Sequence, residues 1–267
     1  MAGVRDFLSS TMAGYPRCST GFDIRICRTV RGRADARACN AVHVERVLEM
    51  STDELHAERV DSASEDVHFT RAYVRAVVEE YSARGDVVLD PFAGYGTTLV
   101  VSQQLGRAPI GIELLPERAA LIRARLGSKG RVVAGDARDL DRFGLGTVDL
   151  CLTSPPYMNA VDHPQNPLTA YTTLDGDYPR YLAELLDVFL AVKRQLRWGG
   201  YLVINAANIR TGDVVTPLAL DIAHALRPHL TFRGETYLRW DRPPESVSGD
   251  YSLVFQKVDG ARSEQQR

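Results

Sequence analysis

The chain has 267 residues, of which 45% are hydrophobic and 25% charged, and its formal net charge is −2. This composition excludes collagen-like, coiled-coil and disordered chains, and it is typical of one large α/β domain with an appendage or of two small domains. The near-neutral charge gives no global signature of nucleic-acid binding, although a local basic groove could exist within it. No apolar stretch approaches the roughly 18 residues of a membrane span, so we expect a cytoplasmic protein without a membrane partner.

The cysteines do not form a recognisable metal or redox motif. Cys18, Cys27, Cys39 and Cys151 include no pair separated by two residues. The first three and His43 could in principle hold a metal, but their spacing is unusual for zinc. We therefore predict reduced thiols and no metal site.

The first 65 residues show no sustained periodicity beyond a short helical stretch at 41–50, and they end in a polar run at 61–66. We interpret 1–65 as a small N-terminal appendage and linker, and 66–267 as the main domain. Five arginines of this segment could contact phosphates, or they could form an ordinary solvated surface, which we favour. They are Arg25, Arg28, Arg31, Arg33 and Arg37.

Helical and strand-like patterns alternate from residue 69 onward. The predicted helices occupy 69–81, 99–105, 116–126, 178–196 and 217–226. The predicted strands occupy 87–89, 109–113, 131–134, 148–152, 201–204, 230–240 and 251–258. The last two strands follow each other directly and suggest an antiparallel edge. The alternation predicts a mostly parallel, doubly wound α/β sheet, whose ligands bind beyond the carboxyl ends of its strands.

A glycine-rich turn at 90–98, with the sequence DPFAGYGTT, follows the first of these strands. Glycines in such a turn let backbone N–H groups approach a ligand closely. The turn lacks the glycine spacing of dinucleotide-binding proteins. A nucleoside without a pyrophosphate would need one carboxylate for its ribose diol and another for its adenine amine. Glu113 and Asp136, at the ends of the second and third strands, could supply these groups, or each could merely cap the helix that follows.

A second motif, Ser154-Pro-Pro-Tyr157, follows the strand at 148–152. Two successive prolines at the end of a strand fix a rigid turn. Carbonyl groups in a rigid turn are well-placed acceptors.

The two motifs, in this order on their strands, resemble those of the S-adenosylmethionine-dependent amino-methyltransferases of DNA, over about residues 68–258. The resemblance implies S-adenosyl-L-methionine as cofactor and a Rossmann-like class I methyltransferase fold, with a seven-stranded, mostly parallel sheet and an antiparallel edge strand. It assigns the glycine turn to the methionine part of the cofactor, Glu113 to the ribose and Asp136 to the adenine. The cofactor-binding residues predicted in this way are Phe69, Asp90, Phe92, Ala93, Gly94, Gly96, Thr97, Glu113, Leu114, Asp136 and Ala137.

The resemblance assigns the second motif to the exocyclic amine of the target base. Such an amine is a poor nucleophile because its lone pair is delocalised into the ring. The Ser154 hydroxyl and the Pro155 carbonyl could each accept one N–H and so direct the lone pair toward the methyl group. Tyr157 would stack on the base, which is worth about 1–3 kcal/mol, once the base has been flipped out of a duplex. The predicted catalytic residues are Ser154, Pro155, Pro156 and Tyr157, and the predicted substrate-binding residues are Tyr157, Asn159 and Asp162.

Two features depart from the family pattern. Tyr95 stands where the family usually has a small residue such as serine, which predicts a differently shaped cofactor pocket. Predicted strands fill most of the chain between Gly96 and Ser154, so no large target-recognition domain fits. Only the first 65 residues and the loop at 158–177 are left to contact the substrate.

The predicted partner is nucleic acid, with DNA favoured. Within the resemblance, serine in the first position of the second motif favours cytosine N4, and adenine N6 is the alternative. An RNA base or a nucleoside-like small molecule is a further alternative, because a recognition domain is missing. A catalytically idle subunit that binds the cofactor or nucleic acid for a partner is disfavoured by the presence of Ser154, Tyr157 and Glu113.

Overall fold

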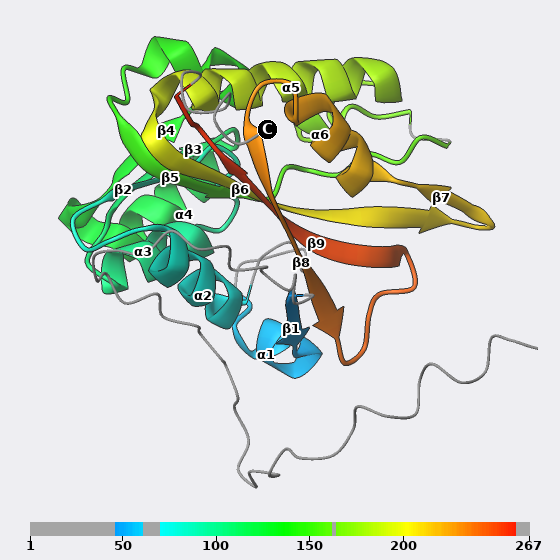
Figure 1. Cartoon of the computed structure of the whole chain (residues 1–267), viewed down its shortest axis with the longest axis horizontal. Coiled ribbons are helices and arrows are strands. Elements are labelled where there is room, and N and C mark those ends of the chain that lie inside the picture. Colours follow the sequence, from blue (N-terminus) through cyan, green and yellow to red (C-terminus); the bar gives the residue numbers. More distant parts are fainter. Residues whose placement is uncertain (1–45, 61–69, 162–163, 260–267) are drawn as a thin grey trace, which may run out of the picture. The chain divides into compact units, whose positions relative to one another are not determined.

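A mixed sheet runs through the part of the chain that the computed structural model describes, residues 46–60, 70–161 and 164–259 (Figure 1). All of these residues belong to one unit, Val44–Arg267. The sheet has nine strands in the order β1-β8-β9-β6-β5-β2-β3-β4, and β7 pairs with β6 outside this path.

The strands are β1 (Arg46–Met50), β2 (Val87–Asp90), β3 (Ala108–Glu113), β4 (Arg131–Ala134), β5 (Val148–Thr153), β6 (Leu196–Thr211), β7 (Val214–Thr216), β8 (Thr231–Trp240) and β9 (Val247–Gln256). The α-helices are α1 (Thr52–Ala57), α2 (Arg71–Tyr81), α3 (Thr97–Gln104), α4 (Pro116–Leu126), α5 (Tyr178–Gln195) and α6 (Leu218–Leu226). Three short 3-10 helices complete the described elements: η1 (Gly127–Lys129), η2 (Ala137–Phe143) and η3 (Pro167–Thr169).

The seven predicted strands and five predicted helices are all present, and the predicted α/β class with a mostly parallel sheet is confirmed. Two details differ. The sheet gains β1 and β7, so it has nine strands among the described residues instead of seven. The antiparallel strand β9 lies between β6 and β8 and is not an edge strand, because it pairs with β8 on one side and with most of β6 on the other. A sequence pattern of two successive strands does not reveal which of them lies at the edge of the sheet and which lies between other strands.

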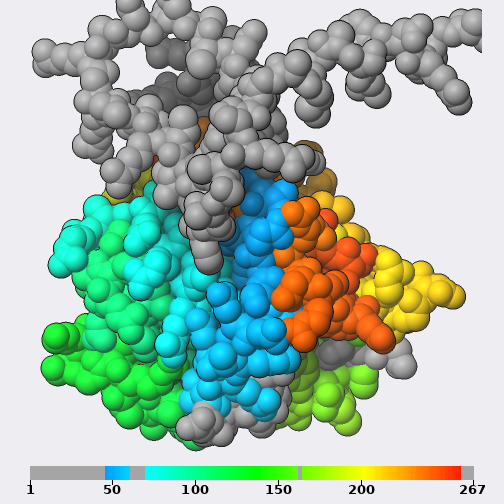
Figure 2. Space-filling model, turned by 90° about the horizontal axis from the view of Figure 1, so that it is seen from below, coloured from blue at the N-terminus to red at the C-terminus, as the bar shows by residue number. Residues whose placement is uncertain are grey.

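The segment before residue 66 contributes to this sheet. Residues 46–50 form β1 and are not part of a helical stretch, because they pair in parallel with the open edge of β8, from Arg46 opposite Thr236 to Met50 opposite Trp240. Met50 is 6% exposed and packs in the same cluster as Tyr73 of α2. Figure 2 shows this segment in blue, between α2 in cyan and the β8–β9 region in orange.

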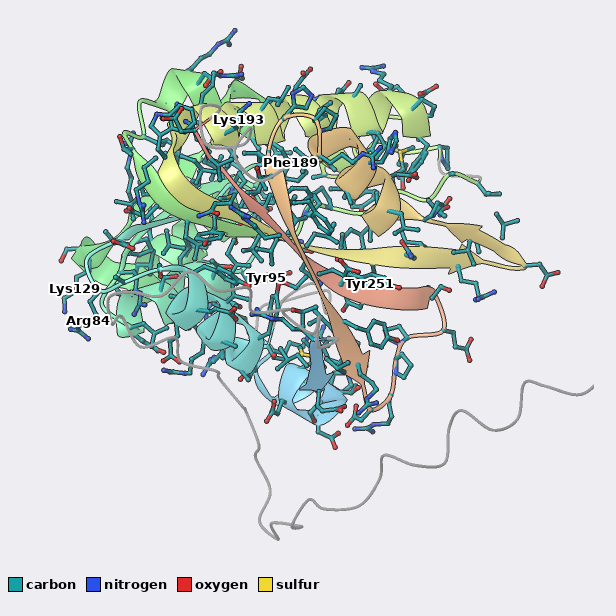
Figure 3. All side chains as sticks on the ribbon, in the orientation of Figure 1. Arg84, Tyr95, Lys129, Phe189, Lys193 and Tyr251 are labelled. Carbon is teal, nitrogen blue, oxygen red and sulfur yellow. The ribbon has the colours of Figure 1, made fainter. Side chains whose placement is uncertain are left out.

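Alternate residues of the central strands pack against helices on opposite faces of the sheet, as the two-residue period of a strand requires. Cys151 and Leu202 lie in the cluster formed with α5 and α6, whereas Leu150 and Val203 pack with α2. Phe189 of α5 is 1% exposed and points from the helix toward the sheet (Figure 3). None of the helices in the described ranges is long and apolar enough to cross a membrane.

The carboxyl ends of the parallel strands define one edge of the sheet. β5, β2, β3 and β4 are consecutive neighbours and run in the same direction. Adjacent strands lie about 4.8 Å apart, so the residues that follow them are brought together. Asp90, Glu113 and Thr153 end three of these strands, and the predicted site residues lie at or beyond these ends.

Candidate active site

The glycine turn leaves β2 at Asp90 and enters α3 at Thr97. Gly94 and Gly96 have φ angles of 54° and 82°, in the left-handed region that favours glycine. A Cβ added to Gly96 would lie 2.9 Å from Cγ2 of Ile122 on α4. The chain's own packing therefore requires glycine at position 96, independently of any ligand.

Asp90 connects this turn to the second motif. Its carboxylate is 2% exposed, and its Oδ1 accepts hydrogen bonds from the Phe92 N–H at 3.1 Å and from the Thr153 hydroxyl at 2.7 Å. Thr153 ends β5, so this buried contact joins the ends of β2 and β5. Burial raises the pKa of Asp90 to about 6, against the opposing effect of its hydrogen bonds.

Glu113 connects the turn to β3. Its Oε2 accepts from the Gly94 N–H at 2.8 Å, and its Oε1 accepts from the Leu115 N–H at 2.9 Å. The residue is 7% exposed, and burial raises the pKa of its carboxyl group. Each carboxylate oxygen can accept a second hydrogen bond, so these two contacts leave acceptor capacity at the end of β3. Leu114, the next predicted residue, is half-buried.

Asp136 lies beyond β4, where it caps η2. It accepts from the Arg138 N–H at 2.9 Å, and the Arg138 guanidinium pairs with it at 2.7 Å while also reaching Glu184 at 2.9 Å. Burial acts to raise the pKa of Asp136, but the hydrogen bonds and charge of Arg138 outweigh it and lower that pKa. Capping, one of the two interpretations of Asp136, is thus observed, and Ala137 beside it is buried.

Tyr95, which departs from the family pattern, is contacted by two arginines of α4. Its side chain is 5% exposed, and the Arg118 guanidinium lies 4.7 Å from the centre of its ring. Arg125 donates to its carbonyl oxygen. Figure 3 labels Tyr95 below the crossing strands of the sheet. The bulky ring is accommodated by the neighbouring helix.

A hydrogen bond from α5 holds the second motif. The Tyr181 hydroxyl, on a side chain 1% exposed, donates to the Pro156 carbonyl at 2.8 Å. Among the described residues no donor pairs with the Pro155 carbonyl oxygen. The Pro156 carbonyl is thus fixed by the protein, whereas the carbonyl of the buried Pro155, beside the half-buried Ser154, has no donor among the described residues.

A row of side-chain hydrogen bonds leads from Ser154 into the sheet. The Ser154 hydroxyl donates to the Tyr157 oxygen at 3.1 Å, and the Tyr157 hydroxyl donates to Oδ1 and the main-chain oxygen of Asn205, both at 3.3 Å. Asn205 Nδ2 donates to Asp250 Oδ1 at 2.6 Å, and the Trp240 indole N–H donates to Asp250 Oδ2 at 2.8 Å. We call these five residues the Ser154–Asp250 network. Burial, and then the charge of Asp250, raise the pKa of Tyr157.

The loop after the motif borders a surface pocket. The pocket has a volume of about 450 Å³ and lies between residues 158–160, residue 164 and residues 176–179. Asn159, a predicted substrate-binding residue, lines it, but its Oδ1 also accepts from the Val161 N–H at 3.0 Å. Most of the residues that line this pocket belong to the loop at 158–177, which we expect to contact the substrate.

Several predicted residues lie outside the described part of the chain and stay predictions. They are Phe69 of the cofactor set, Asp162 of the substrate set, the five N-terminal arginines, Cys18, Cys27, Cys39 and His43. Within the described residues no group of three or more histidine, cysteine or acidic side chains is arranged to hold a metal ion.

Four residues that support the site were not identified from the sequence: Tyr181, Asn205, Trp240 and Asp250. Asn205 had a usable signal, because it interrupts the apolar run of β6 with a side chain that is 8% exposed. Asp250 directly precedes the predicted strand at 251–258. Tyr181 belongs to the apolar face of a helix, where the sequence does not show that its hydroxyl has a partner.

Comparison with known protein families covers the glycine turn but not the second motif. The DNA methylase family model, of the N6/N4 type, matches residues 44–124. Type II methyltransferase M.SmaI of Serratia marcescens is 50% identical over 58 residues, which cover 22% of this chain and 20% of the relative. Type II methyltransferase M.BamHI of Bacillus amyloliquefaciens is 53% identical over 47 residues, 18% of this chain and 11% of the relative. The chain thus spans a fifth or less of the length of these two curated relatives.

Two solved structures show the same fold. TrmN from Thermus thermophilus superposes with a TM-score of 0.53 at 23% identity, covering 71% of this chain and 49% of TrmN. An S-adenosylmethionine-dependent methyltransferase from Clostridium acetobutylicum gives a TM-score of 0.50 at 12% identity, covering 71% and 91% of the two chains. The predicted Rossmann-like methyltransferase fold is confirmed. The family match and its relatives confirm that the chain is related to the amino-methyltransferase family of DNA, as its two motifs predict.

Proposed function

We propose that this protein transfers a methyl group from S-adenosyl-L-methionine to an exocyclic amine of a DNA base, with cytosine N4 favoured over adenine N6. The observation that carries the proposal is that the Ser154 hydroxyl and the Pro155 carbonyl, to which no described residue donates, follow each other at the end of β5, directly beside β2 and its glycine turn. The relationship to DNA methylases supports DNA over RNA as the substrate.

The residues at the ends of β2, β3 and β4 fit a nucleoside cofactor. Glu113 has acceptor capacity for a ribose diol, and its bond to the Gly94 N–H holds the turn against the same strand end. Asp136, one strand further, can accept the adenine amine on oxygens that already bind Arg138. The cofactor supplies an electrophilic methyl group on a sulfonium, and these three residues would bind its nucleoside and methionine parts.

At the adjacent strand end, the second motif would hold the target amine. Two acceptors, Ser154 Oγ and the Pro155 oxygen, can each take one N–H, which localises the nitrogen lone pair and aligns it for attack. Tyr181 keeps the turn in place through the Pro156 carbonyl. The half-buried ring of Tyr157 can stack on the base, while its hydroxyl anchors the ring to β6.

The choice of cytosine N4 depends on serine in the first position of the motif. Both candidate bases present an exocyclic amine, so the two acceptors alone do not discriminate between them. Discrimination would come from the shape of the pocket around Tyr157 and from the loop at 158–177.

One experiment tests the activity and identifies the base. The full chain is incubated with labelled S-adenosylmethionine and, separately, duplex DNA, single-stranded DNA, RNA and cytidine, and the released nucleosides are analysed by mass spectrometry. We expect N4-methylcytosine from DNA. N6-methyladenine would replace the base in the proposal, and methylation of RNA or cytidine alone would replace the substrate. The absence of transfer to all four would overturn the proposed function.

A pair of serine variants serves as the control in this assay. Ser154→Ala removes the proposed acceptor and should abolish most of the transfer. Ser128→Ala removes an exposed hydroxyl just before the amino end of β4. This is the end of the strand opposite to the candidate site, so the variant should leave transfer unchanged.

A further inference from the structure

The Ser154–Asp250 network connects the turn after β5 with β6, β8 and β9. Its side chains come from the end of β5, from β6, from β8 and from β9, and Asn205 is only 8% exposed. Polar side chains at such positions need satisfied hydrogen bonds, because an unmet buried polar group is costly. This network meets that condition, and the roles it suggests rest on the proposed function of Ser154.

The inner end of the network has a fixed hydrogen-bond direction. An indole N–H can only donate, and Trp240 donates to Asp250 Oδ2 at 2.8 Å. Asp250 Oδ1 accepts from Asn205 Nδ2 at 2.6 Å, so both carboxylate oxygens are engaged by N–H donors. Asn205 Nδ2 also lies 3.3 Å from the carbonyl oxygen of Tyr251, the next residue of β9, which Figure 3 labels. With its amide nitrogen turned toward β9, Asn205 presents its Oδ1 to Tyr157.

This direction propagates outward to Ser154. The Tyr157 hydroxyl has one proton, for which Oδ1 and the main-chain oxygen of Asn205 are both acceptors at 3.3 Å, so the Tyr157 oxygen is left to accept the Ser154 proton at 3.1 Å. The Ser154 hydroxyl also has one proton, and that proton is thereby turned away from the target side. Only lone pairs then remain on Ser154 Oγ for another group.

We propose that Asp250 and Asn205 are positioning residues that fix the direction of the hydrogen bonds through Tyr157, so that Ser154 meets the target amine as an acceptor. A serine hydroxyl without this constraint can rotate and present its proton to the amine N–H, which is the wrong partner. The role requires the tyrosine hydroxyl as well as the ring, and it adds a function to Tyr157 besides stacking.

The test uses isosteric variants of the full chain. Asp250→Asn exchanges one acceptor for a donor, so Asn205 and Trp240 no longer both find an acceptor on that side chain. Tyr157→Phe keeps the ring and removes only the hydroxyl. The matched control is Asp221→Asn, because Asp221 accepts a tyrosine hydroxyl, that of Tyr178, at 2.7 Å between α5 and α6 and outside the network.

Turnover is measured with tritiated S-adenosylmethionine on mixed-sequence duplex DNA and its denatured strands, together with cofactor affinity and melting temperature. We expect Asp250→Asn and Tyr157→Phe each to lower turnover about ten-fold, the size of one net hydrogen bond, with cofactor affinity unchanged. Turnover of the double variant should be no lower than that of the less active single variant, because both changes interrupt the same row of hydrogen bonds. Asp221→Asn should retain wild-type turnover.

The outcomes separate this proposal from the proposed function. If the wild-type chain methylates neither DNA form, both are overturned. If the wild type is active and Asp250→Asn matches Asp221→Asn, or if the two network variants act additively on turnover, only the positioning role is overturned. Should Asp250→Asn fail to fold, Tyr157→Phe decides alone: full turnover with the ring retained would overturn the role of the hydroxyl.

Discussion

The two sides of the candidate site are built differently. On the proposed cofactor side, the turn after β2 is joined to the end of β3 by the Gly94 N–H, which donates to Glu113, and the Leu115 N–H donates to the same carboxylate. On the proposed amine side, Ser154 is joined to β6 and β9 mainly through side chains, as far as Asp250, and the main-chain oxygen of Asn205 is a second acceptor for Tyr157. The first arrangement depends on local backbone geometry, whereas the second depends on residues nearly a hundred positions apart. The family match, residues 44–124, covers the glycine turn and Glu113 but not the second motif.

The largest expected effect separates the two sides by function. Ser154→Ala should lower turnover about 100-fold or more, the order observed when one preorganised partner of a transition state is removed. Cofactor affinity should stay within about two-fold of wild type, because a net hydrogen bond of about 1 kcal/mol to the cofactor would already change it more. Steady-state kinetics and calorimetry on the same preparation measure both quantities. Equal losses of turnover and cofactor affinity would contradict the separation.

Asp90 joins the two sides, and its titration should make the free energy of unfolding depend on pH. Its folded pKa of about 6 lies above the usual value of 3.8. The native state therefore keeps the proton to higher pH than the unfolded chain does, and the free energy of unfolding falls as pH rises from about 4 to about 6, then stays level. The expected contribution is about 3 kcal/mol, from about 1.4 kcal/mol for each pH unit of difference. Denaturant unfolding between pH 4 and 8 measures it.

The control for this titration is Asp90→Asn. Phe92 and Thr153 both donate to Oδ1, an acceptor that asparagine retains. Asparagine does not titrate in this range, so the decrease in the free energy of unfolding between pH 4 and 6 should be smaller in the variant than in the wild type. Because other buried acids, Glu113 and Asp250, also have raised pKa values, the difference between the two proteins is the quantity to compare. Identical pH profiles would show that Asp90 does not titrate in this range.

The sequence predicts the cofactor side better than the amine side, for physical reasons. Alternating apolar strands and periodic helices define the βαβ order, and glycines mark the turn, because these signals act over a few residues. Asn205 and Asp250 are 45 positions apart and meet only because β9 pairs with β6 in one register, Asn205 opposite Ser252. A pattern of apolar residues predicts that both strands exist but does not predict this register.

A long-range pairing also explains why the sequence mispredicts residues 46–50, where the described part of the chain begins. Residues 46–50 contain apolar residues at spacings that fit a helix, yet the exposed edge of β8 takes them as a parallel strand. Such pairing depends on a partner 190 positions later in the sequence, as Arg46 opposite Thr236 shows. Local periodicity carries no information about that partner.

The next prediction tests whether Glu113 is more than a structural anchor of the cofactor side. Glu113→Ala removes the acceptor proposed for the ribose, and hydrogen bonds to a charged group are worth about 1.5–3 kcal/mol. Cofactor affinity should therefore weaken by roughly 10- to 150-fold. The melting temperature is needed as well, because the Gly94 and Leu115 N–H groups lose their acceptor. Unchanged affinity in folded protein would leave Glu113 with the structural role alone.

The smallest expected effect concerns Gly96, whose neighbours indicate a packing role. Gly96→Ala should destabilise the fold because alanine is strained at a φ of 82° and its Cβ would meet Ile122 at 2.9 Å. Gly127→Ala is a matched control, since Gly127 has a φ of 61° but no atom within 4 Å of an added Cβ. The difference in unfolding free energy between the two variants therefore reports the contact with α4, and we expect about 1–3 kcal/mol, the usual cost of overpacking. If the two variants are equally stable, the close approach of the turn to α4 is relieved by movement of Ile122, and a loss of cofactor affinity in Gly96→Ala would then point to direct contact between the turn and its ligand.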